Sequence, residues 1–436
     1  MENAERVRFA IREWHEKEFP QIRERFVEAG LFTEIDHIVD IVGVRRSGKT
    51  FIMFLMAKKL AKEFGKEAVI YINFENKVLY PINEGLLDEI LNYVFENGFS
   101  KAFLFLDEIQ NVKSWERWAR STYDAYKGKI KIIVSGSSSK IIRGDIGKIL
   151  TGRHVSIKVF PLSFREFLDF KGKNISAKDL EYSIKEQAKI KVLLEEYFSY
   201  SSFPEIILAQ SLPIKSELLK AYYEDILYKD VIEKYNIKEK QVLENFVKFL
   251  YSNISGYFSY KRGKDYLSSF GISTSTRTLL RYTSILEEVF LFFFVPILSF
   301  KARDQLKYPR KVYAIDVALR NVADPTEDMG RKTENVVYLE LRRRQKNSEI
   351  NYWKSEKQEE VDFAIREGQK IKSLIQVCWD ITKKETKERE TKALIKASAE
   401  LGCSSLLIIT NNYNAQEKIA GKKIIFKPLW KWLLEE

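Results

Sequence analysis

The chain has 436 residues, 45 % of them hydrophobic, and a formal net charge of +12. This length predicts two to four domains with sizeable cores. The basic excess favours a polyanionic partner such as nucleic acid. A highly charged surface of the thermophile type would have the same composition. The two cysteines exclude a disulfide framework, and the charged first 26 residues exclude a secretory signal, so we expect a cytoplasmic protein.

A glycine-flanked loop follows the first predicted strand. The run GVRRSGKT, Gly43–Thr50, lies between the apolar stretch 38–42 and a predicted helix at 51–64, which is the context that phosphate binding requires. Backbone N–H groups and the helix dipole attract phosphate there, so we expect Lys49 to reach the β- and γ-phosphates and Thr50 to hold Mg²⁺. A chance turn is the alternative, which the flanking strand and helix disfavour. We expect the nucleotide to contact the whole loop: Gly43, Val44, Arg45, Arg46, Ser47, Gly48, Lys49 and Thr50.

Two acidic residues follow the apolar run at 102–106. Asp107, at the end of a buried strand, can hold Mg²⁺ together with Thr50, and Glu108 can polarise the attacking water. Two solvated acids at an ordinary strand end are the alternative. The next strand ends in a serine-rich turn, where the hydroxyl of Ser135 could sense the γ-phosphate or simply belong to the turn. We therefore predict that Lys49, Asp107 and Glu108 are catalytic and that Ser135 contributes to nucleotide binding.

Two arginines follow the serine-rich turn. Arg143 and Arg153 could each stabilise charge during phosphoryl transfer, in cis or on a neighbouring subunit, or could be plain surface residues. Arg153 is the stronger catalytic candidate because it stands in Thr-Gly-Arg beside a predicted strand. The order strand, phosphate loop, helix, strand, acidic strand end and strand predicts a parallel sheet with helices on both faces.

Five motifs resemble, in the same order, those of AAA+-related P-loop ATPases of archaea and bacteria: GVRRSGKT, FLFLDEIQNVKSW, VSGSSSKI, TGRHVSIKVFPLSFREF and SSFPEIIL. The resemblance covers most of the chain and is most specific in the ATPase part. It implies a Walker A motif at Gly43–Thr50, a Walker B motif at Asp107 and Glu108, and a sensor in the turn 135–138. It also implies ATP rather than GTP as the nucleotide, and a C-terminal domain of poorly defined function.

The middle of the chain predicts a helical lid followed by a winged helix. Residues 163–235 are helical and charged, which is typical of a lid over the nucleotide. Residues 236–330 predict a helix, a turn, a second helix and a β-hairpin. Within that region the apolar run 289–300 is too short to span a bilayer and predicts a buried strand pair.

Basic residues in the predicted winged helix are candidates for DNA binding. Arg277 and Arg281 are four residues apart, so they share one face of the second helix, which could enter the DNA major groove. Lys307 and Arg310 add positive charge in the following hairpin. A winged helix used only for packing between domains is the alternative, and Glu288 at the far end of the helix would repel phosphates.

From about residue 331 the order of predicted elements resembles the restriction-endonuclease-like PD-(D/E)XK fold. The resemblance implies carboxylates at Asp362 and Glu334 that bind metal, followed by a Glu-x-Lys pair on the next strand. Gln376 and Cys378 occupy the positions of that pair, and they supply neither a negative ligand nor a positive charge. We therefore expect a degenerate nuclease site without cleavage activity in a domain that could still bind DNA.

The sequence thus predicts an α/β protein with four parts: a parallel-sheet P-loop ATPase core (1–162), a helical lid (163–235), a winged-helix domain (236–330) and a restriction-endonuclease-like α/β domain (331–436). We expect it to bind and hydrolyse ATP with Mg²⁺ and to bind or remodel DNA, with the nucleotide state controlling the lid and the winged helix. Two alternatives remain, a slow ATPase switch that acts on a protein partner and an ATP-gated nuclease. A homo-oligomer fits each of them, and we expect no membrane association.

Overall fold

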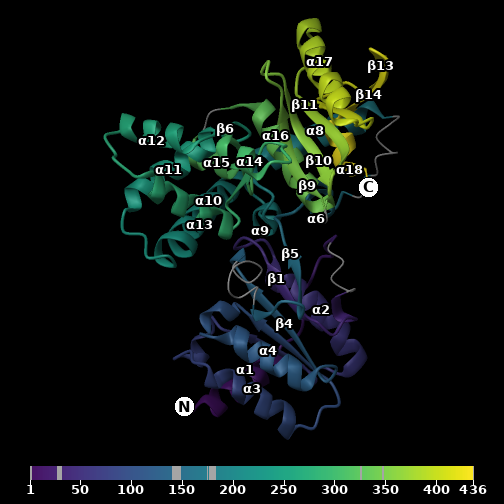
Figure 1. Ribbon diagram of the computed structural model, residues 1–436. Helices are drawn as coiled ribbons and strands as arrows, with labels where there is room; N and C mark the ends of the chain where they lie inside the picture. Colours follow the sequence, from purple (N-terminus) through teal and green to yellow (C-terminus); the bar gives the residue numbers. More distant parts are fainter. Residues whose placement is uncertain are drawn as a thin grey trace. The chain divides into compact units, whose positions relative to one another are not determined.

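The computed structural model describes residues 2–26, 32–139, 149–173, 175, 183–324, 327–345 and 348–435. The chain divides into two compact units, one formed by residues 1–161 with 288–290 and the other by residues 162–287 with 291–436 (Figure 1). No helix within the described residues combines the length and the apolar character needed to cross a bilayer.

The first unit is built on a five-stranded parallel sheet with the strand order β2-β3-β4-β1-β5. Its strands are β1 (Ile38–Val42), β2 (Val69–Asn73), β3 (Ala102–Asp107), β4 (Ile130–Gly136) and β5 (His154–Lys158). The three central strands are buried along their whole length, which explains their continuous apolar runs. The predicted parallel sheet is confirmed, and β4 lies between the strand that precedes the phosphate loop and the strand that ends at Asp107.

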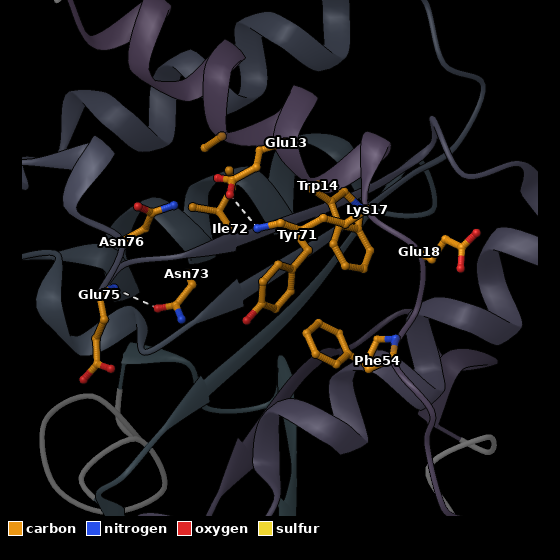
Figure 2. A pocket seen from close by; sticks show the side chains of 12 residues that line it. Glu13, Trp14, Lys17, Glu18, Phe54, Tyr71, Ile72, Asn73, Glu75 and Asn76 are labelled. Carbon is orange, nitrogen blue, oxygen red and sulfur yellow. Dashed lines mark hydrogen bonds and ion pairs between the residues drawn. The ribbon is translucent and has the colours of Figure 1, made fainter.

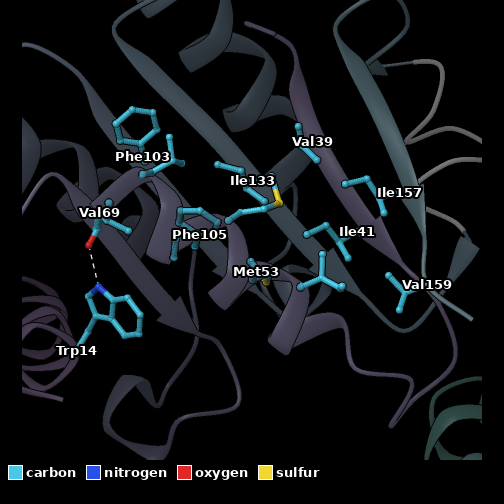
Figure 3. Packing of buried hydrophobic residues seen from close by; sticks show 14 residues of the cluster. Trp14, Val39, Ile41, Met53, Val69, Phe103, Phe105, Ile133, Ile157 and Val159 are labelled. Carbon is cyan, nitrogen blue, oxygen red and sulfur yellow. Dashed lines mark hydrogen bonds between the residues drawn. The ribbon is translucent and has the colours of Figure 1, made fainter. Parts of the chain in front are cut away.

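One helix of the first unit precedes the sheet, and three helices connect its strands. They are α1 (Asn3–Glu16), α2 (Lys49–Phe64), α3 (Gly85–Glu96) and α4 (Trp115–Tyr126), with the short 3₁₀ turns η2 (Lys77–Leu79) and η3 (Ile109–Asn111). Figure 3 shows the core in which α2 packs on the sheet through Met53, and in which the indole of Trp14 from α1 donates to the carbonyl of Val69 at 2.7 Å. Because Met53 is fully buried, its replacement by alanine would cost about 2–5 kcal/mol.

The second unit begins with a helical region and continues into a small sheet. The helical region contains α6 (Phe164–Phe170), α8 (Ile184–Tyr200), α9 (Pro204–Leu208), α10 (Leu212–Glu224) and the π-helical segment η5 (Asp225–Glu233). The next elements are α11 (Lys240–Ser252), β6 (Tyr257–Phe258), α12 (Tyr260–Ser269), α13 (Thr276–Glu288), β7 (Phe292–Val295), α14 (Ala302–Lys307), β8 (Arg310–Ala314) and α15 (Leu319–Ala323). The three strands form an antiparallel sheet in the order β6-β8-β7.

The apolar run 289–300 forms one strand rather than the predicted pair. Only β7 lies in this run, and its partner is β8. Pro296 follows β7 directly and has no N–H to donate to a ladder, so the strand ends there. The chain then runs beside Tyr352, whose carbonyl accepts the N–H of Leu298 at 2.6 Å.

A buried aspartate joins the helical region to the chain that follows β8. The carboxylate of Asp316 accepts the hydroxyl of Ser201 at 2.9 Å, the N–H of Ser202 at 2.7 Å and the N–H of Ala318 at 2.8 Å. Burial raises the pKa of Asp316, while these donors lower it. The start of the SSFPEIIL motif therefore has a structural function within the second unit.

The C-terminal part of the second unit contains a six-stranded mixed sheet in the order β13-β14-β12-β11-β10-β9. Its elements are α16 (Met329–Arg344), β9 (Glu349–Lys354), β10 (Glu360–Glu367), β11 (Lys370–Cys378), α17 (Lys384–Leu401), β12 (Leu406–Thr410), β13 (Ala415–Ile419), β14 (Lys422–Pro428) and α18 (Leu429–Leu434). Strands β9, β10 and β11 precede the charged helix α17, and strand β12 follows it. The edge strand β13 was not predicted, because its sequence AQEKI is polar, as is typical of an edge.

Candidate functional site

The loop between β1 and α2 depends on a glycine at its first position. A Cβ on Gly43 would lie 2.1 Å from the carbonyl oxygen of Val159, far inside any real contact. The two chain segments approach this closely because the N–H of Val159 donates to the carbonyl of Val42 at 2.7 Å. Arg46 and Gly48 have positive φ angles of 67° and 97°, so the loop curls before α2 begins. This shape brings successive backbone groups round the N-terminus of α2, where they can bind an anion.

The ammonium of Lys49 lies inside the loop. It donates to the carbonyls of Gly43 at 3.1 Å and Val44 at 3.2 Å, and the side chain is 5 % exposed. The buried Oγ of Ser47 has no hydrogen-bond partner among the described residues. A fixed positive charge and an unpartnered hydroxyl in one curled loop are suited to an incoming phosphate.

Arg25 holds the other side of the loop and was not predicted from the sequence. Its guanidinium donates to the carbonyl of Ser47 at 2.9 Å and to the carbonyl of Phe160 at 2.9 Å. The segment before β1 therefore braces the phosphate loop against the end of β5. No spacing pattern indicates this role, because Arg25 is 22 residues from Ser47 and 135 from Phe160.

Asp107 is the centre of a network of hydroxyl donors. Its Oδ2 accepts Thr50 Oγ1 at 2.8 Å and the phenol of Tyr71 at 2.7 Å, and its Oδ1 accepts the hydroxyl of Ser135. The parallel register of β3 and β4 places Leu106 opposite Val134, so Asp107 and Ser135 are neighbours. Burial, then the negative charge of Asp107, raises the pKa of Tyr71, so this phenol stays a neutral donor. The predicted residues Thr50, Asp107 and Ser135 are thus in direct contact, and Tyr71 joins them.

Glu108 follows Asp107 in a strained backbone conformation. Its φ is 53°, in the left-handed region that non-glycine residues rarely adopt, and its N–H donates to Ser135 Oγ at 3.1 Å. The amide of Gln110 donates to its carboxylate. Gln110 therefore holds the Glu108 carboxylate in place. Gln110 was not identified from the sequence, although it follows directly in DEIQ.

The side chains present fit a magnesium ion. The hydroxyl of Thr50 and the carboxylate of Asp107 are hard oxygen donors 2.8 Å apart, and Mg²⁺ in proteins is commonly held by one or two such groups, with water and phosphate completing its shell. Within the described part of the chain, no group of three or more His, Cys, Asp and Glu residues is arranged to hold a metal ion. The site thus lacks an all-protein metal cage and is suited to an ion that arrives with a nucleotide.

Arg153 does not lie near the phosphate loop of the same chain. It directly precedes β5, so it lies at the amino end of a strand whose carboxyl end approaches Gly43. Five residues of strand separate these ends by about 16 Å. Its guanidinium donates to Asp124 at 2.7 Å on the surface of the same unit. A role in cis is therefore not supported, and a role on a neighbouring subunit stays a prediction. Arg143 lies outside the described residues.

A pocket of about 570 Å³ adjoins this network on the side of α1 and β2 (Figure 2). The rings of Trp14, Phe54 and Tyr71 lie together there, with the Trp14 centroid 5.0 Å from Tyr71 and 5.7 Å from Phe54. Glu75 on its rim forms a 3.4 Å ion pair with Arg45 of the phosphate loop. Tyr71 therefore lines the pocket and bonds to Asp107, which links the pocket wall to the candidate nucleotide site.

The four predicted DNA-binding residues do not form one group. Arg277 and Arg281 are exposed on α13 and line an open pocket of about 720 Å³ that also contains Lys238. Arg281 donates to the carbonyl of Tyr235 at 3.1 Å. Lys307 at the end of α14 and Arg310 at the start of β8 do not line this pocket.

The predicted nuclease-like residues are close together but are engaged with one another. Asp362 accepts the N–H of Val377 at 2.8 Å and donates its own N–H to Gln376 Oε1 at 3.1 Å. The amide of Gln376 donates in turn to Glu390 at 2.7 Å. Cys378 lies in the hydrophobic core of this part, where burial raises the pKa of its thiol to about 12. Lys311 was not predicted to lie beside these carboxylates, but its ammonium lies 2.7 Å from Asp362 and 3.0 Å from Glu334.

Comparison with known proteins agrees with this geometry in the first unit. Residues 36–168 match the model of an AAA domain, and residues 191–329 and 329–432 match two domains of unknown function (DUF8612 and DUF4143). The chain is similar to an uncharacterized protein of Haemophilus influenzae, with 26 % identity over 95 % of this chain and 98 % of that protein. The chain is also similar to the structure of the Aeropyrum pernix Orc1 protein in complex with DNA, over 73 % of this chain and 92 % of that chain at 12 % sequence identity. The TM-score of 0.32 is too low for this similarity to bear on function.

Sequence identity to a second protein is higher. The uncharacterized protein MJ1544 of Methanocaldococcus jannaschii is 37 % identical over 405 residues, which is 90 % of this chain and 87 % of that protein. The chain therefore belongs to the protein family of MJ1544, and its residues 36–168 form an AAA domain.

Proposed function

We propose that the chain is an ATPase whose nucleotide state controls its binding to DNA. The observation that carries the ATPase part is the contact of Thr50, at the start of α2, with Asp107, at the end of β3, beside a loop whose lysine is buried. Two oxygen donors beside a phosphate cradle are the arrangement that phosphoryl transfer uses. Bound Mg²⁺ would supply charge neutralisation at the phosphates.

The protein residues have separate roles in the proposed reaction. Lys49 binds the β- and γ-phosphates, for which it exchanges its present contacts with the carbonyls of Gly43 and Val44. Glu108 orients the attacking water and takes its proton, and Gln110 keeps the carboxylate in place. Ser135 bonds to both Asp107 and the N–H of Glu108, so a change at the phosphate can reach β4 through it.

The proposed DNA contact rests on two features of the second unit. The element order α11-β6-α12-α13-β7-α14-β8, with the sheet order β6-β8-β7, supports a winged helix in which α13 is the second helix of the helix-turn-helix. The exposed pair Arg277 and Arg281 lies on α13 with Lys238 nearby, which supports contact with phosphates. The overall charge of +12 agrees with a polyanionic partner.

The DNA contact is tested with a double variant, Arg277→Ala with Arg281→Ala. If both arginines neutralise phosphates, the slope of log affinity against log salt falls by about two, and duplex binding weakens at all sequences. The matched control is Lys58→Ala with Lys62→Ala, which removes two exposed charges four residues apart on α2. An unchanged slope in the arginine variant would leave α13 with a packing function.

Coupling between the two activities is tested by steady-state ATP hydrolysis with Mg²⁺. Turnover is measured without nucleic acid and with single-stranded, duplex and branched DNA. Stimulation by one form, lost in the arginine double variant, supports the proposed control of DNA binding. A slow rate that no DNA form changes would favour the alternative, a switch that acts on a protein partner.

A further inference from the structure

The pocket of the first unit between α1, α2 and β2 is lined by three aromatic rings. Its volume is about 570 Å³, and the ring centroids of Trp14, Phe54 and Tyr71 lie 5.0 to 5.7 Å from one another. The indole N–H of Trp14 is used by the carbonyl of Val69 at 2.7 Å, and the phenol of Tyr71 donates to Asp107 at 2.7 Å. Because these donors are already engaged, the two side chains offer a ligand mainly the surfaces of their rings.

Three carboxylates line the same pocket, together with one ammonium. Figure 2 shows Glu13, Glu18 and Glu75 around the rings, with Lys17 near Glu13. Lys17 is engaged with Glu13 at 2.5 Å, and Glu75 lies 3.4 Å from Arg45. Glu18 is exposed and forms no ion pair within the part of the chain that the structure describes. The lining therefore has an excess of negative charge, although the chain as a whole carries +12.

The other polar groups of the lining leave the carboxylates as the acceptors for a ligand. The amide oxygen of Asn73 accepts the N–H of Glu75 at 2.8 Å, and the amide oxygen of Asn76 accepts the N–H of Val78 at 3.1 Å. Carboxylates accept hydrogen bonds and repel phosphate and other anions. The pocket is therefore suited to a cation that donates several hydrogen bonds.

The aromatic cluster already holds one cation of this chain. The ammonium of Lys66, which does not line the pocket, lies 5.8 Å from the ring centroid of Trp14 and 5.7 Å from that of Phe19. Among organic cations, a guanidinium combines a plane that stacks on aromatic rings with a fork of N–H donors that matches a carboxylate. The pocket volume also has room for the chain that carries such a group.

We propose that this pocket is a binding site for a guanidinium group, which packs against the aromatic cluster and donates to Glu18 and Glu75. The group can belong to a small molecule or to an arginine side chain of another protein, because the recognised chemistry is the same. A bound guanidinium would contact Tyr71, whose phenol donates to Asp107. The ligand would then lie one side chain away from the candidate magnesium ligand.

The test measures agmatine binding to the full-length chain by isothermal titration calorimetry. Nucleotide is left out, so the result does not depend on the proposed ATPase activity. The parent protein is expected to bind about one agmatine per chain, and to bind its ureido analogue, which has the same shape without the guanidinium charge, at least about 10-fold more weakly. A second titration uses the blocked peptide acetyl-Gly-Arg-Gly-amide. Tighter binding of the peptide than of agmatine assigns the site to an arginine side chain, and the reverse order assigns it to a small molecule.

The double variant Glu18→Gln with Glu75→Gln should weaken agmatine binding by about 10-fold, because two partners of the cation lose their charge. Both side chains are exposed, so the variant should unfold at the same temperature as the parent. The matched control is Glu63→Gln with Glu84→Gln, which removes two exposed carboxylates of the same unit outside the pocket and should leave the affinity unchanged.

Three results would overturn the proposal. The first is a parent protein that binds neither agmatine nor the arginine peptide. The second is equal affinity of the parent for agmatine and the ureido analogue, because the charge would then have no role. The third is an affinity for agmatine that the pocket variant and the control variant change to the same extent.

Discussion

The close approach of Gly43 to Val159 makes Gly43→Ala the most informative single substitution in the phosphate loop. The new Cβ would lie 2.1 Å from the Val159 carbonyl oxygen, and real contacts do not come below 3.0 Å. One of the two backbones must therefore move by about 0.9 Å. Gly43 has no positive φ, so any effect is due to contact and not to backbone strain.

The loss of stability in Gly43→Ala can be estimated from the contacts that this backbone movement would disrupt. The 2.7 Å hydrogen bond from Val159 N–H to the Val42 carbonyl is the nearest contact, and an unsatisfied buried group costs about 1–3 kcal/mol. Overpacking adds about 1–3 kcal/mol, so we expect the free energy of unfolding to fall by about 2–6 kcal/mol. The carbonyl of Gly43 also accepts Lys49, so the lysine that we propose to bind phosphate is displaced and ATP hydrolysis should fall about 100-fold.

The assay combines urea unfolding with steady-state ATP hydrolysis. The control is Gly330→Ala, where a Cβ would lie 3.4 Å from Asp328 Oδ1 in ordinary contact, and this variant should keep full hydrolysis. A Gly43→Ala protein with the stability and turnover of the parent would refute the packing of the loop against β5.

Three further outcomes are expected. Lys49→Ala should weaken binding of a fluorescent ATP analogue by about 10- to 100-fold, because a charge-assisted hydrogen bond to phosphate is lost, and equal affinity would remove the assignment of the loop. Ser135→Ala should lower the midpoint of thermal unfolding, since it costs about 1–3 kcal/mol by leaving the Glu108 N–H without its acceptor, and Ser100→Ala, at an exposed serine of the same unit, is the control with an unchanged midpoint. Glu334→Gln should flatten the pH dependence of urea unfolding. The pKa of Glu334 is about 8 in the folded chain, above its ordinary value of 4.5, so the folded state holds a proton that the unfolded state loses, and stability declines as the pH rises from about 5 to 8. Equal slopes for the two proteins would contradict this account.

The geometry of the candidate nucleotide site was largely predictable because its signals are local. The phosphate loop occupies eight consecutive residues between a strand and a helix, and Asp107 ends a strand that is buried throughout. Parallel strands place their carboxyl ends at one edge of a sheet, which is why Asp107 and Ser135 meet. The same rule separates Arg153 from this edge, because Arg153 stands before β5 and not after it, so a role on a neighbouring subunit stays a prediction.

Residues that act across long sequence separations were not predictable. Tyr71 reaches Asp107 from a strand 36 residues earlier, and Arg25 reaches Phe160 across 135 residues. Lys311 lies 51 residues before Asp362 and on a different sheet, so neither periodicity nor motif spacing connects them. The sequence did show that Gln376 and Cys378 replace the expected charged pair, but only the fold shows which cation faces the remaining carboxylates.

The central claim is that Glu108 activates water for hydrolysis of ATP bound by the phosphate loop. The measurement that tests it most directly compares Glu108→Gln with the parent protein, both for ATP affinity and for steady-state turnover with Mg²⁺. The account predicts unchanged affinity and turnover lower by about 10²- to 10⁴-fold, the range for loss of a general base. Normal turnover in the variant would contradict the assignment of Glu108, and a parent protein that neither binds nor hydrolyses ATP would contradict the account as a whole.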